Sequence, residues 1–234
     1  MRFIHKRPEP PPLTAWKQTQ PVPTSSRKDW KRLQAPLKPE LMAWLLQDQG
    51  YLCCYCESRI YDLVSGHIEH LTPRGEHPER MFDFDHLLAS CNGKAQQPDT
   101  ADQPPGQHCG HKRKRTPLFP TPLQPHCADL LAWQEEQVHP APQLDAETRT
   151  RVKETLHKTL KLGHRFLNLA RKEAIESMRD EVELSLEDLD RLIQSLDQPD
   201  SNGQFTPYRS AIEAALRQER AGLMALTSST GLKP

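Results

Sequence analysis

Four cysteines are the most distinctive residues of this sequence. Cys53 and Cys56 form a C-x-x-C pair, a spacing that lets a tight turn present two thiolates to one tetrahedral ion. Cys91 and Cys109 follow downstream and would complete a four-thiolate zinc site. A thioredoxin-like redox pair and unliganded buried thiols are the alternatives, and we favour zinc because no suitable strand and helix bracket the pair. Two cysteines are then left over: Cys54 and Cys127.

An acidic residue and a histidine stand side by side between the two halves of this cysteine set, in the segment GHIEHLTPR. The carboxylate of Glu69 suits a hard divalent cation, and the imidazole of His70 titrates near neutrality, which suits it to deprotonate water. Neighbours on a strand face opposite ways, so the pair could address one reacting centre only at a strand end or bulge. Pro73 is expected to end the strand. His67 could bond a phosphate or a nearby carboxylate, or be an ordinary exposed strand residue.

The first 36 residues are predicted to form a proline-rich basic arm. Eight of the 22 prolines lie before residue 40, and the first 38 residues carry nine basic and two acidic side chains, a net charge of +7. Proline enrichment at this level indicates extended or looped chain. With Trp16 and Trp30 among the charges, the arm is either a disordered basic tail or a strap that docks on a partner or on phosphates, with the tryptophans as anchors.

The middle of the chain is expected to be organised around metal. Residues 37–127 hold all six cysteines and seven of the eleven histidines. Apolar residues recur at helical spacing from Lys38 to Gln49, and Gly50 is a natural helix stop. We therefore expect a short helix, followed by short strands and tight loops around zinc.

Residues 128–234 are predicted to form a helical module with balanced charge. The apolar pattern indicates a long helix or a pair broken near Gly163, and then helices over Leu184–Leu196 and Tyr208–Leu226. Taken with the middle segment, the fold class is α+β and mostly helical.

The composition limits the classes of protein that fit. The chain has 31 basic and 31 acidic residues, so no global affinity for nucleic acid is predicted, although local patches are compatible with this balance. It has no run of about 20 apolar residues and no apolar stretch of a secretory signal. We expect a cytoplasmic protein without membrane contact, whose cysteines are thiols or metal ligands.

Several of these motifs together resemble the HNH endonuclease family, whose core is a ββα-metal finger. The matching elements are Cys53–Cys56, EHLTP at Glu69–Pro73, HLLASCNG at His86–Gly93 and CGHKR at Cys109–Arg113. Within that family the chain is most similar to the small nuclease subunit of Septu-type and retron-associated antiphage systems. An insertion at Lys94–His108 opens the second cysteine pair into a loop.

The resemblance implies roles for individual residues. His70 would be the general base, and the backbone or a side chain near His86 would orient it; this position is often Asn in the family. Glu69 and His111 would bind a catalytic Mg²⁺ or Mn²⁺, with Asn92 as the alternative to His111. The four cysteines would hold a structural Zn²⁺.

The resemblance also implies a substrate and a partner. We expect an endonuclease that hydrolyses DNA as the effector of an antiphage complex with an ABC/SMC-type ATPase. An RNA-cleaving or tRNA-cleaving effector and a non-catalytic, zinc-containing nucleic-acid adaptor are the alternatives. Beside such a centre, basic side chains would clamp the phosphate backbone without sequence preference. The residues expected to do so are Arg74, Lys112, Arg113, Lys114 and Arg115.

Overall fold

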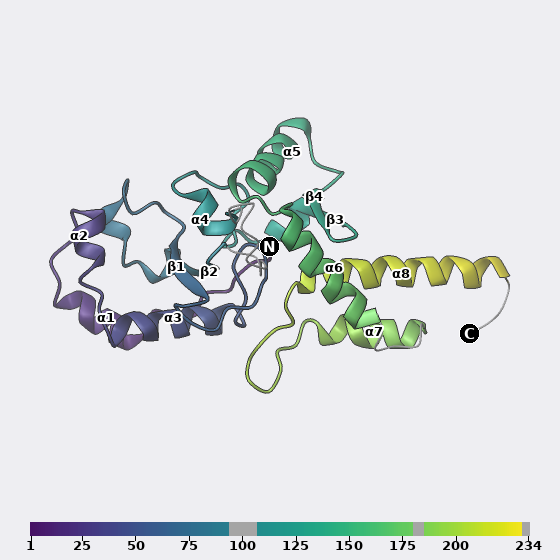
Figure 1. Cartoon of the computed structure of the whole chain (residues 1–234), viewed down its shortest axis with the longest axis horizontal. Coiled ribbons are helices and arrows are strands. Elements are labelled where there is room, and N and C mark those ends of the chain that lie inside the picture. The colour runs from purple at the N-terminus through teal and green to yellow at the C-terminus, as the bar shows by residue number, and fades with distance from the viewer. Residues whose placement is uncertain (94–106, 180–184, 231–234) are drawn as a thin grey trace, which may run out of the picture.

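The fold is α+β, with many helices and two small antiparallel sheets (Figure 1). The computed structural model describes residues 1–93, 107–179 and 185–230, so most of the insertion expected at Lys94–His108 lies outside the described residues. The α-helices are α1 (Pro11–Gln18), α2 (Ser26–Trp30), α3 (Leu37–Asp48), α4 (Cys109–Arg113), α5 (Ala146–Lys153), α6 (Arg165–Arg179), α7 (Leu186–Ser195) and α8 (Arg209–Thr230). The strands are β1 (Gly66–His70), β2 (Leu87–Cys91), β3 (Leu131–Gln134) and β4 (Gln137–Pro140). Short 3₁₀ turns lie at Pro78–Arg80, Phe84–His86 and Cys127–Leu130, and a π-helix at Glu154–Thr159.

The N-terminal segment differs from the expected extended arm. It contains α1 and α2, and its apolar side chains Leu13 and Leu33 are buried in the main hydrophobic cluster. Two of its basic side chains form ion pairs within the chain: Lys6 and Arg7 both pair with the buried carboxylate of Asp48. The segment is therefore not the extended arm that was expected: it forms two helices and packs on its own chain.

The middle segment begins as predicted. The helix expected over Lys38–Gln49 is confirmed as α3, and Gly50 follows it with φ of +56°. A turn closed by a bridge between Leu52 and Arg59 comes next. The amide of Gln49 donates to the carbonyls of Leu52 and Ala89 and so ties this turn to β2.

Strands β1 and β2 form the sheet that positions the residues of interest. They pair antiparallel, with Gly66 opposite Cys91 and His70 opposite Leu87. All five residues of β2 are buried, since α3 packs against this strand and α4 contacts it as well. The chain order is thus strand, strand and then the five-residue helix α4.

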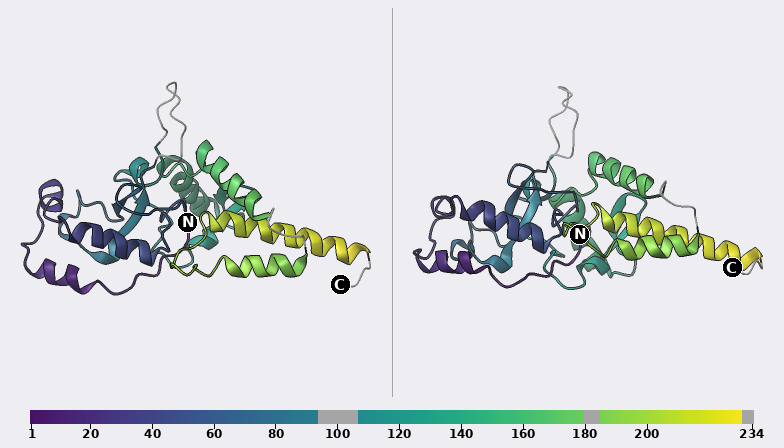
Figure 2. Two further views of the ribbon diagram at one scale, coloured as in Figure 1. Left: turned by 60° about the horizontal axis from the view of Figure 1, so that its bottom comes forward. Right: turned by 90° about the horizontal axis from the view of Figure 1, so that it is seen from below.

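The C-terminal part is mostly helical, as expected. The pair of helices broken near Gly163 is confirmed, because the π-helix ends at Thr159 and α6 begins at Arg165. Helices α7 and α8 lie side by side (Figures 1 and 2) and are joined by an ion pair between Arg220 and Asp190. None of the helices within the described ranges is long and apolar enough to span a membrane.

Two hydrophobic clusters hold the structure together. The larger runs from Met1 to Leu167 and takes residues from all three segments distinguished in the sequence. The smaller joins α6, α7 and α8 through Ile175, Leu189 and Ile212. The sheet that carries Glu69 and His70 contributes residues to the larger cluster.

Candidate metal centre and catalytic groove

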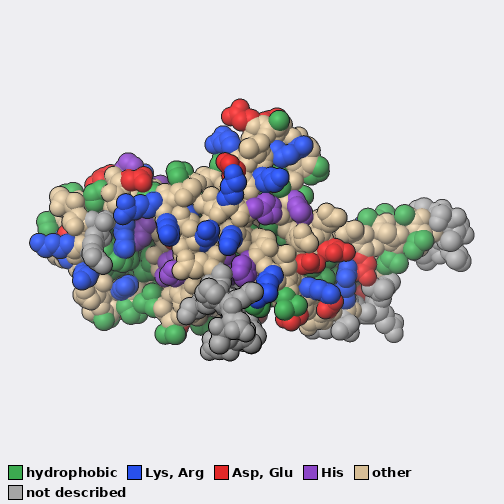
Figure 3. Space-filling model, turned by 45° about the horizontal axis from the view of Figure 1, so that its top comes forward, with side chains coloured by type: hydrophobic (Ala, Val, Ile, Leu, Met, Phe, Trp, Pro, Cys, Tyr) green, Lys and Arg blue, Asp and Glu red, His purple; other side chains and the backbone are tan. Residues whose placement is uncertain are grey.

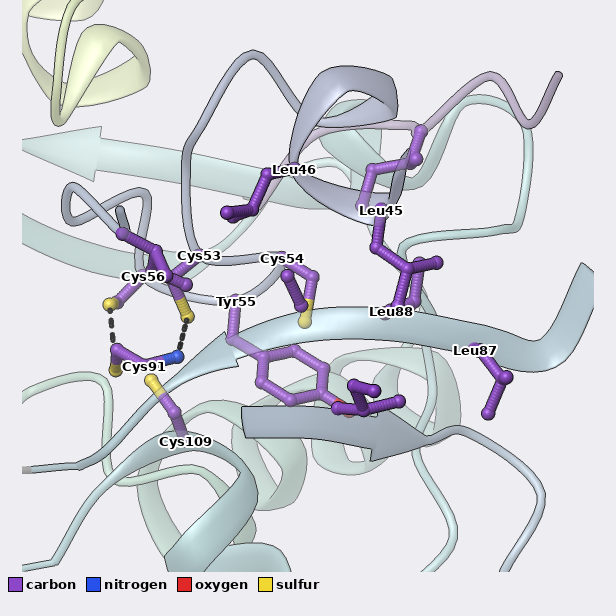
Figure 4. Close-up of a cluster of buried hydrophobic side chains, with 14 of the residues drawn as sticks. Leu45, Leu46, Cys53, Cys54, Tyr55, Cys56, Leu87, Leu88, Cys91 and Cys109 are labelled. Atoms are coloured by element: carbon purple, nitrogen blue, oxygen red, sulfur yellow. Dashed lines mark hydrogen bonds between the residues drawn. The ribbon is translucent and has the colours of Figure 1, made fainter. Parts of the chain in front are cut away.

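The four predicted cysteine ligands come together. The sulfur atoms of Cys53, Cys56, Cys91 and Cys109 all lie within 4.8 Å of one another and are buried (Figure 4). A tetrahedral zinc site with Zn–S bonds of about 2.3 Å has sulfur atoms about 3.8 Å apart, and the Cys56 and Cys91 sulfurs are 3.8 Å apart. All four are free thiols rather than disulfides. This cluster could therefore hold a metal ion such as zinc.

Backbone geometry brings the four ligands to one point. Cys53 and Cys56 lie in the turn after α3, where the Cys53 amide donates to the Ser58 carbonyl. Cys91 ends β2, and its amide donates to the Cys53 sulfur at 3.3 Å. Cys109 begins α4, and its amide donates to the carbonyl of Leu160.

The electrostatics of the cluster favour a bound cation. Burial raises the pKa of the Cys109 thiol well above its ordinary value. Burial also opposes ionisation of Cys53, but hydrogen bonds from Cys109 and other neighbouring thiols hold the Cys53 pKa well below its ordinary value. Several thiolates cannot remain charged in such a buried site unless a cation compensates them. The residues present thus fit a Zn²⁺ ion.

The two remaining cysteines lie outside the cluster. Figure 4 shows Cys54 apart from the four sulfurs, and burial raises its pKa well above the ordinary value. Cys127 is buried in a 3₁₀ turn between α4 and β3.

A groove of about 770 Å³ lies beside β1. Its lining includes three of the expected catalytic or metal-binding residues and three of the expected basic residues. They are Glu69, His70 and His111, with Arg74, Lys114 and Arg115. Glu69 and His70 line the same groove because the groove follows the strand: all five residues of β1 belong to its lining.

The carboxylate of Glu69 is held firmly. Its Oε1 accepts hydrogen bonds from Tyr55 at 3.0 Å and from Arg113 at 2.7 Å, and its Oε2 accepts one from His67 at 3.3 Å. Burial opposes ionisation, but the hydrogen bond from His67 and the charge of Arg113 keep the pKa of Glu69 below its ordinary value. A β-carbon on Gly110 would lie 2.6 Å from Oε2, so only glycine lets α4 approach this oxygen so closely.

The imidazole of His70 is held in one tautomer. Its Nε2 lies 3.1 Å from the carbonyl oxygen of Met81. Because a carbonyl only accepts, Nε2 carries the proton and Nδ1 keeps its lone pair. Burial, with a further contribution from Arg74, lowers the pKa of His70 to about 4. The ring is therefore neutral at pH 7 and keeps its lone pair at Nδ1. A pKa this low makes it a weaker base than the imidazole titrating near neutrality that was expected from the sequence.

Other predicted site residues lie elsewhere. His86 is not among the residues lining the groove; its ring contacts Thr72 and Arg80 because it sits in the 3₁₀ turn before β2. The carbonyl that orients His70 belongs to Met81 instead. Asn92 lines a different groove and donates to the carbonyl of Val64.

The basic residues of the run from Lys112 to Arg115 differ in exposure. Lys114 and Arg115 are exposed, whereas Arg113 is only 2% exposed. Its guanidinium is taken up by Glu69 and by the carbonyls of His70 and Leu71. The expectation that Arg113 contacts a phosphate is therefore wrong; it supports the site from inside. Lys112 is half-buried and not part of the groove lining.

Sequence reasoning gave no site role to three residues that contact the site. Trp30 lines the groove, Tyr55 donates to Glu69 and Met81 accepts from His70. Of these three, only Tyr55 could have been connected with the site from the sequence, because it lies between Cys53 and Cys56. His67 bonds a carboxylate, one of the three alternatives considered for it.

Comparison with known proteins adds no assignment: no family model matches the sequence, and no curated protein matches it.

Proposed function

We propose that this protein is a metal-dependent endonuclease of the HNH type that hydrolyses phosphodiester bonds of DNA. One observation carries the proposal: a single groove gathers a carboxylate, a neutral imidazole and a second imidazole, with cationic side chains around them. Phosphodiester hydrolysis needs a base for water, charge neutralisation at the phosphate and help for the leaving oxygen. The groove residues offer groups for each of these tasks.

Each residue of the groove would have the role that its chemistry allows. His70 would take a proton from water at Nδ1, with its Nε2 proton fixed on the Met81 carbonyl. Glu69 and His111 would hold a divalent cation, which would neutralise charge on the phosphate and stabilise the leaving oxygen. The Oε1 of Glu69 accepts two hydrogen bonds, from Arg113 and Tyr55, whereas Oε2 accepts one longer bond, from His67 at 3.3 Å. Oε2 is therefore the oxygen better suited to this role.

Cationic side chains at the groove fit a phosphate backbone. Arg74, Lys114 and Arg115 line it, and Lys and Arg side chains gather on the face in Figure 3 that extends from the N-terminal elements towards α5. Contacts of this kind bind nucleic acid without reading its sequence.

The cysteine cluster is proposed as a structural zinc site. Four cysteine ligands leave no open coordination position for chemistry. Helix α4 carries both Cys109 of the cluster and His111 of the groove. Zinc would thus hold α4 against the sheet and keep His111 near Glu69.

The proposed setting is an antiphage complex with an ABC/SMC-type ATPase. The sequence resemblance to small nuclease subunits of Septu-type and retron-associated systems supports this setting.

The test is a cleavage assay with matched variants. The protein, alone and with the proposed ATPase partner, would be incubated with phage DNA and with host RNA including tRNA, in Mg²⁺, Mn²⁺ or Ni²⁺, with and without ATP. We expect DNA cleavage that is lost in His70→Ala and His111→Ala while zinc content stays unchanged. Asn92→Ala is the matched control and is expected to cleave.

Two other outcomes would change the assignment. Cleavage of RNA with intact DNA would replace the substrate. Nucleic-acid binding without cleavage under every condition would make the protein a non-catalytic adaptor.

A further inference from the structure

A tryptophan from the N-terminal segment lies against the proposed base. The ring centroids of Trp30 and His70 are 4.5 Å apart, with an interplanar angle of 76°. This is an edge-to-face contact, the arrangement that aromatic rings favour. Trp30 also lines the groove, although it is 40 residues away from His70 in the chain.

Trp30 is itself held by other aromatic rings. It stacks on Phe82, with ring centroids 5.8 Å apart and an interplanar angle of 19°. Phe82 is 4% exposed and receives the edge contact of Trp16 at 4.8 Å. The residue before Phe82 is Met81, whose carbonyl accepts the hydrogen bond of His70. Two neighbouring residues thus support both contacts of His70: Met81 accepts its hydrogen bond, and Phe82 holds the tryptophan that packs against it.

Two groove cations also sit near the tryptophan. The guanidinium carbon of Arg74 is 5.4 Å and the Nζ of Lys38 is 5.9 Å from the Trp30 ring, within the range of cation–π attraction. Removing the indole would therefore disturb Arg74 as well as His70, and the test must separate the two effects.

We propose that Trp30 is a positioning residue for His70, so that the N-terminal segment completes the proposed active site. This inference rests on the proposed function. One hydrogen bond to Met81 fixes the Nε2 edge of the imidazole but lets the ring pivot about that bond. The edge-to-face contact with Trp30 removes this freedom and keeps Nδ1 in one direction. Misplacement of a catalytic group by about 1 Å can lower a rate about 100-fold.

The kinetic test compares Trp30→Ala with Trp30→Phe in the full chain. Trp30→Ala is expected to lower kcat about 100-fold, whereas Trp30→Phe keeps an aromatic edge and stays within about tenfold of wild type. Trp133→Phe is the matched control, since Trp133 packs on Arg171 away from the groove, and wild-type kcat is expected. If Trp30→Ala does not fold, Trp30→Leu takes its place, because leucine fills volume without an aromatic ring.

The split between kcat and KM separates His70 from Arg74. A raised KM at unchanged kcat would assign Trp30 to substrate contact through Arg74 and would overturn the proposal. Wild-type kcat in both Trp30→Ala and Trp30→Leu would also overturn it, as would equal losses in Trp30→Phe and Trp30→Ala.

A second measurement does not depend on cleavage. In an NMR spectrum of the intact protein, the ring current of Trp30 shifts the imidazole resonances of His70, and Trp30→Ala is expected to remove that shift. If the wild type cleaves nothing, the proposed function fails but this spectrum still decides whether Trp30 makes the contact with His70 on which the positioning role depends. Identical His70 resonances in wild type and Trp30→Ala would refute the positioning role.

Discussion

Replacing Arg113 by methionine is expected to destabilise the fold far more than the same change at Arg115. The side chain of Arg113 is 1% exposed and pairs with Glu69, whose side chain is 9% exposed, at 2.7 Å. Methionine keeps much of the length but removes the charge and all the donors. Arg115 lies two residues further on and is exposed, so Arg115→Met is the matched control.

The expected loss of stability follows from the groups that lose their partner when Arg113 is replaced. Removing one partner of a buried ion pair costs about 3–5 kcal/mol, because the other charge stays buried without compensation. The carbonyls of His70 and Leu71 also lose their donor, but they lie at the end of β1, where water can replace it. We therefore expect a loss of about 3–5 kcal/mol for Arg113→Met, against a change within about 0.5 kcal/mol for Arg115→Met.

Urea unfolding followed by tryptophan fluorescence measures this loss. With a slope of about 3 kcal/mol per molar, the midpoint should fall by about 1–2 M. The double variant Glu69→Gln with Arg113→Met removes both charges, and the two changes together should cost about 1–3 kcal/mol less than their sum. Equal midpoints for Arg113→Met and Arg115→Met, or strict additivity with Glu69→Gln, would refute the reasoning.

Three further predictions concern the metal sites. Cys56→Ala should abolish bound zinc measured by elemental analysis of the purified protein, whereas Cys54→Ala, at a buried thiol outside the cluster, should keep about one zinc per chain. Removing zinc with a chelator should lower Tm, because the ligands come from three separate parts of the chain, and restoring zinc should reverse this. Gly110→Ala should displace Glu69, whose Oε2 would lie 2.6 Å from the new methyl group, and lower cleavage about 100-fold. Because the clash is with side-chain ends, stability should fall by only about 1–3 kcal/mol; wild-type cleavage by this variant would contradict the placement of α4.

The cluster of four cysteines could be predicted from the sequence because the chemistry of cysteine is visible in residue type. Cys53 and Cys56 have ligand spacing, and two further cysteines downstream supply the number of ligands that a tetrahedral site needs. The groove could be predicted in part, since Glu69 and His70 are adjacent and differ in chemistry.

Two features of the site were not predicted correctly: the direction of the Arg113 side chain, and the contact between Trp30 and His70, which lie far apart in the chain. Arg113 turns inward because its guanidinium pairs with Glu69 and with the carbonyls of His70 and Leu71. These partners lie far away in the chain, so a run of basic residues does not show which charge is internal. No local pattern could show that Trp30 reaches His70, because that contact depends on how α2 packs.

The hairpin of β3 and β4 was not predicted because its turn lacks the usual signal. The residues between the strands are Glu135 and Glu136, and Glu135 adopts a φ of +53°. Hairpin turns with positive φ ordinarily use glycine, asparagine or aspartate.

The amide of Cys109 and the carbonyl of Leu160 join the metal cluster to the end of the π-helix. Leu156 and Leu160 are also fully buried in the main hydrophobic cluster. A fragment ending at residue 127 would keep all four clustered thiols but would leave that amide without its acceptor and expose the apolar surface that these leucines cover. The cysteine cluster and its sheet therefore cannot be excised at that point as a transferable module, and a fragment for binding studies or domain grafting should extend beyond Leu167.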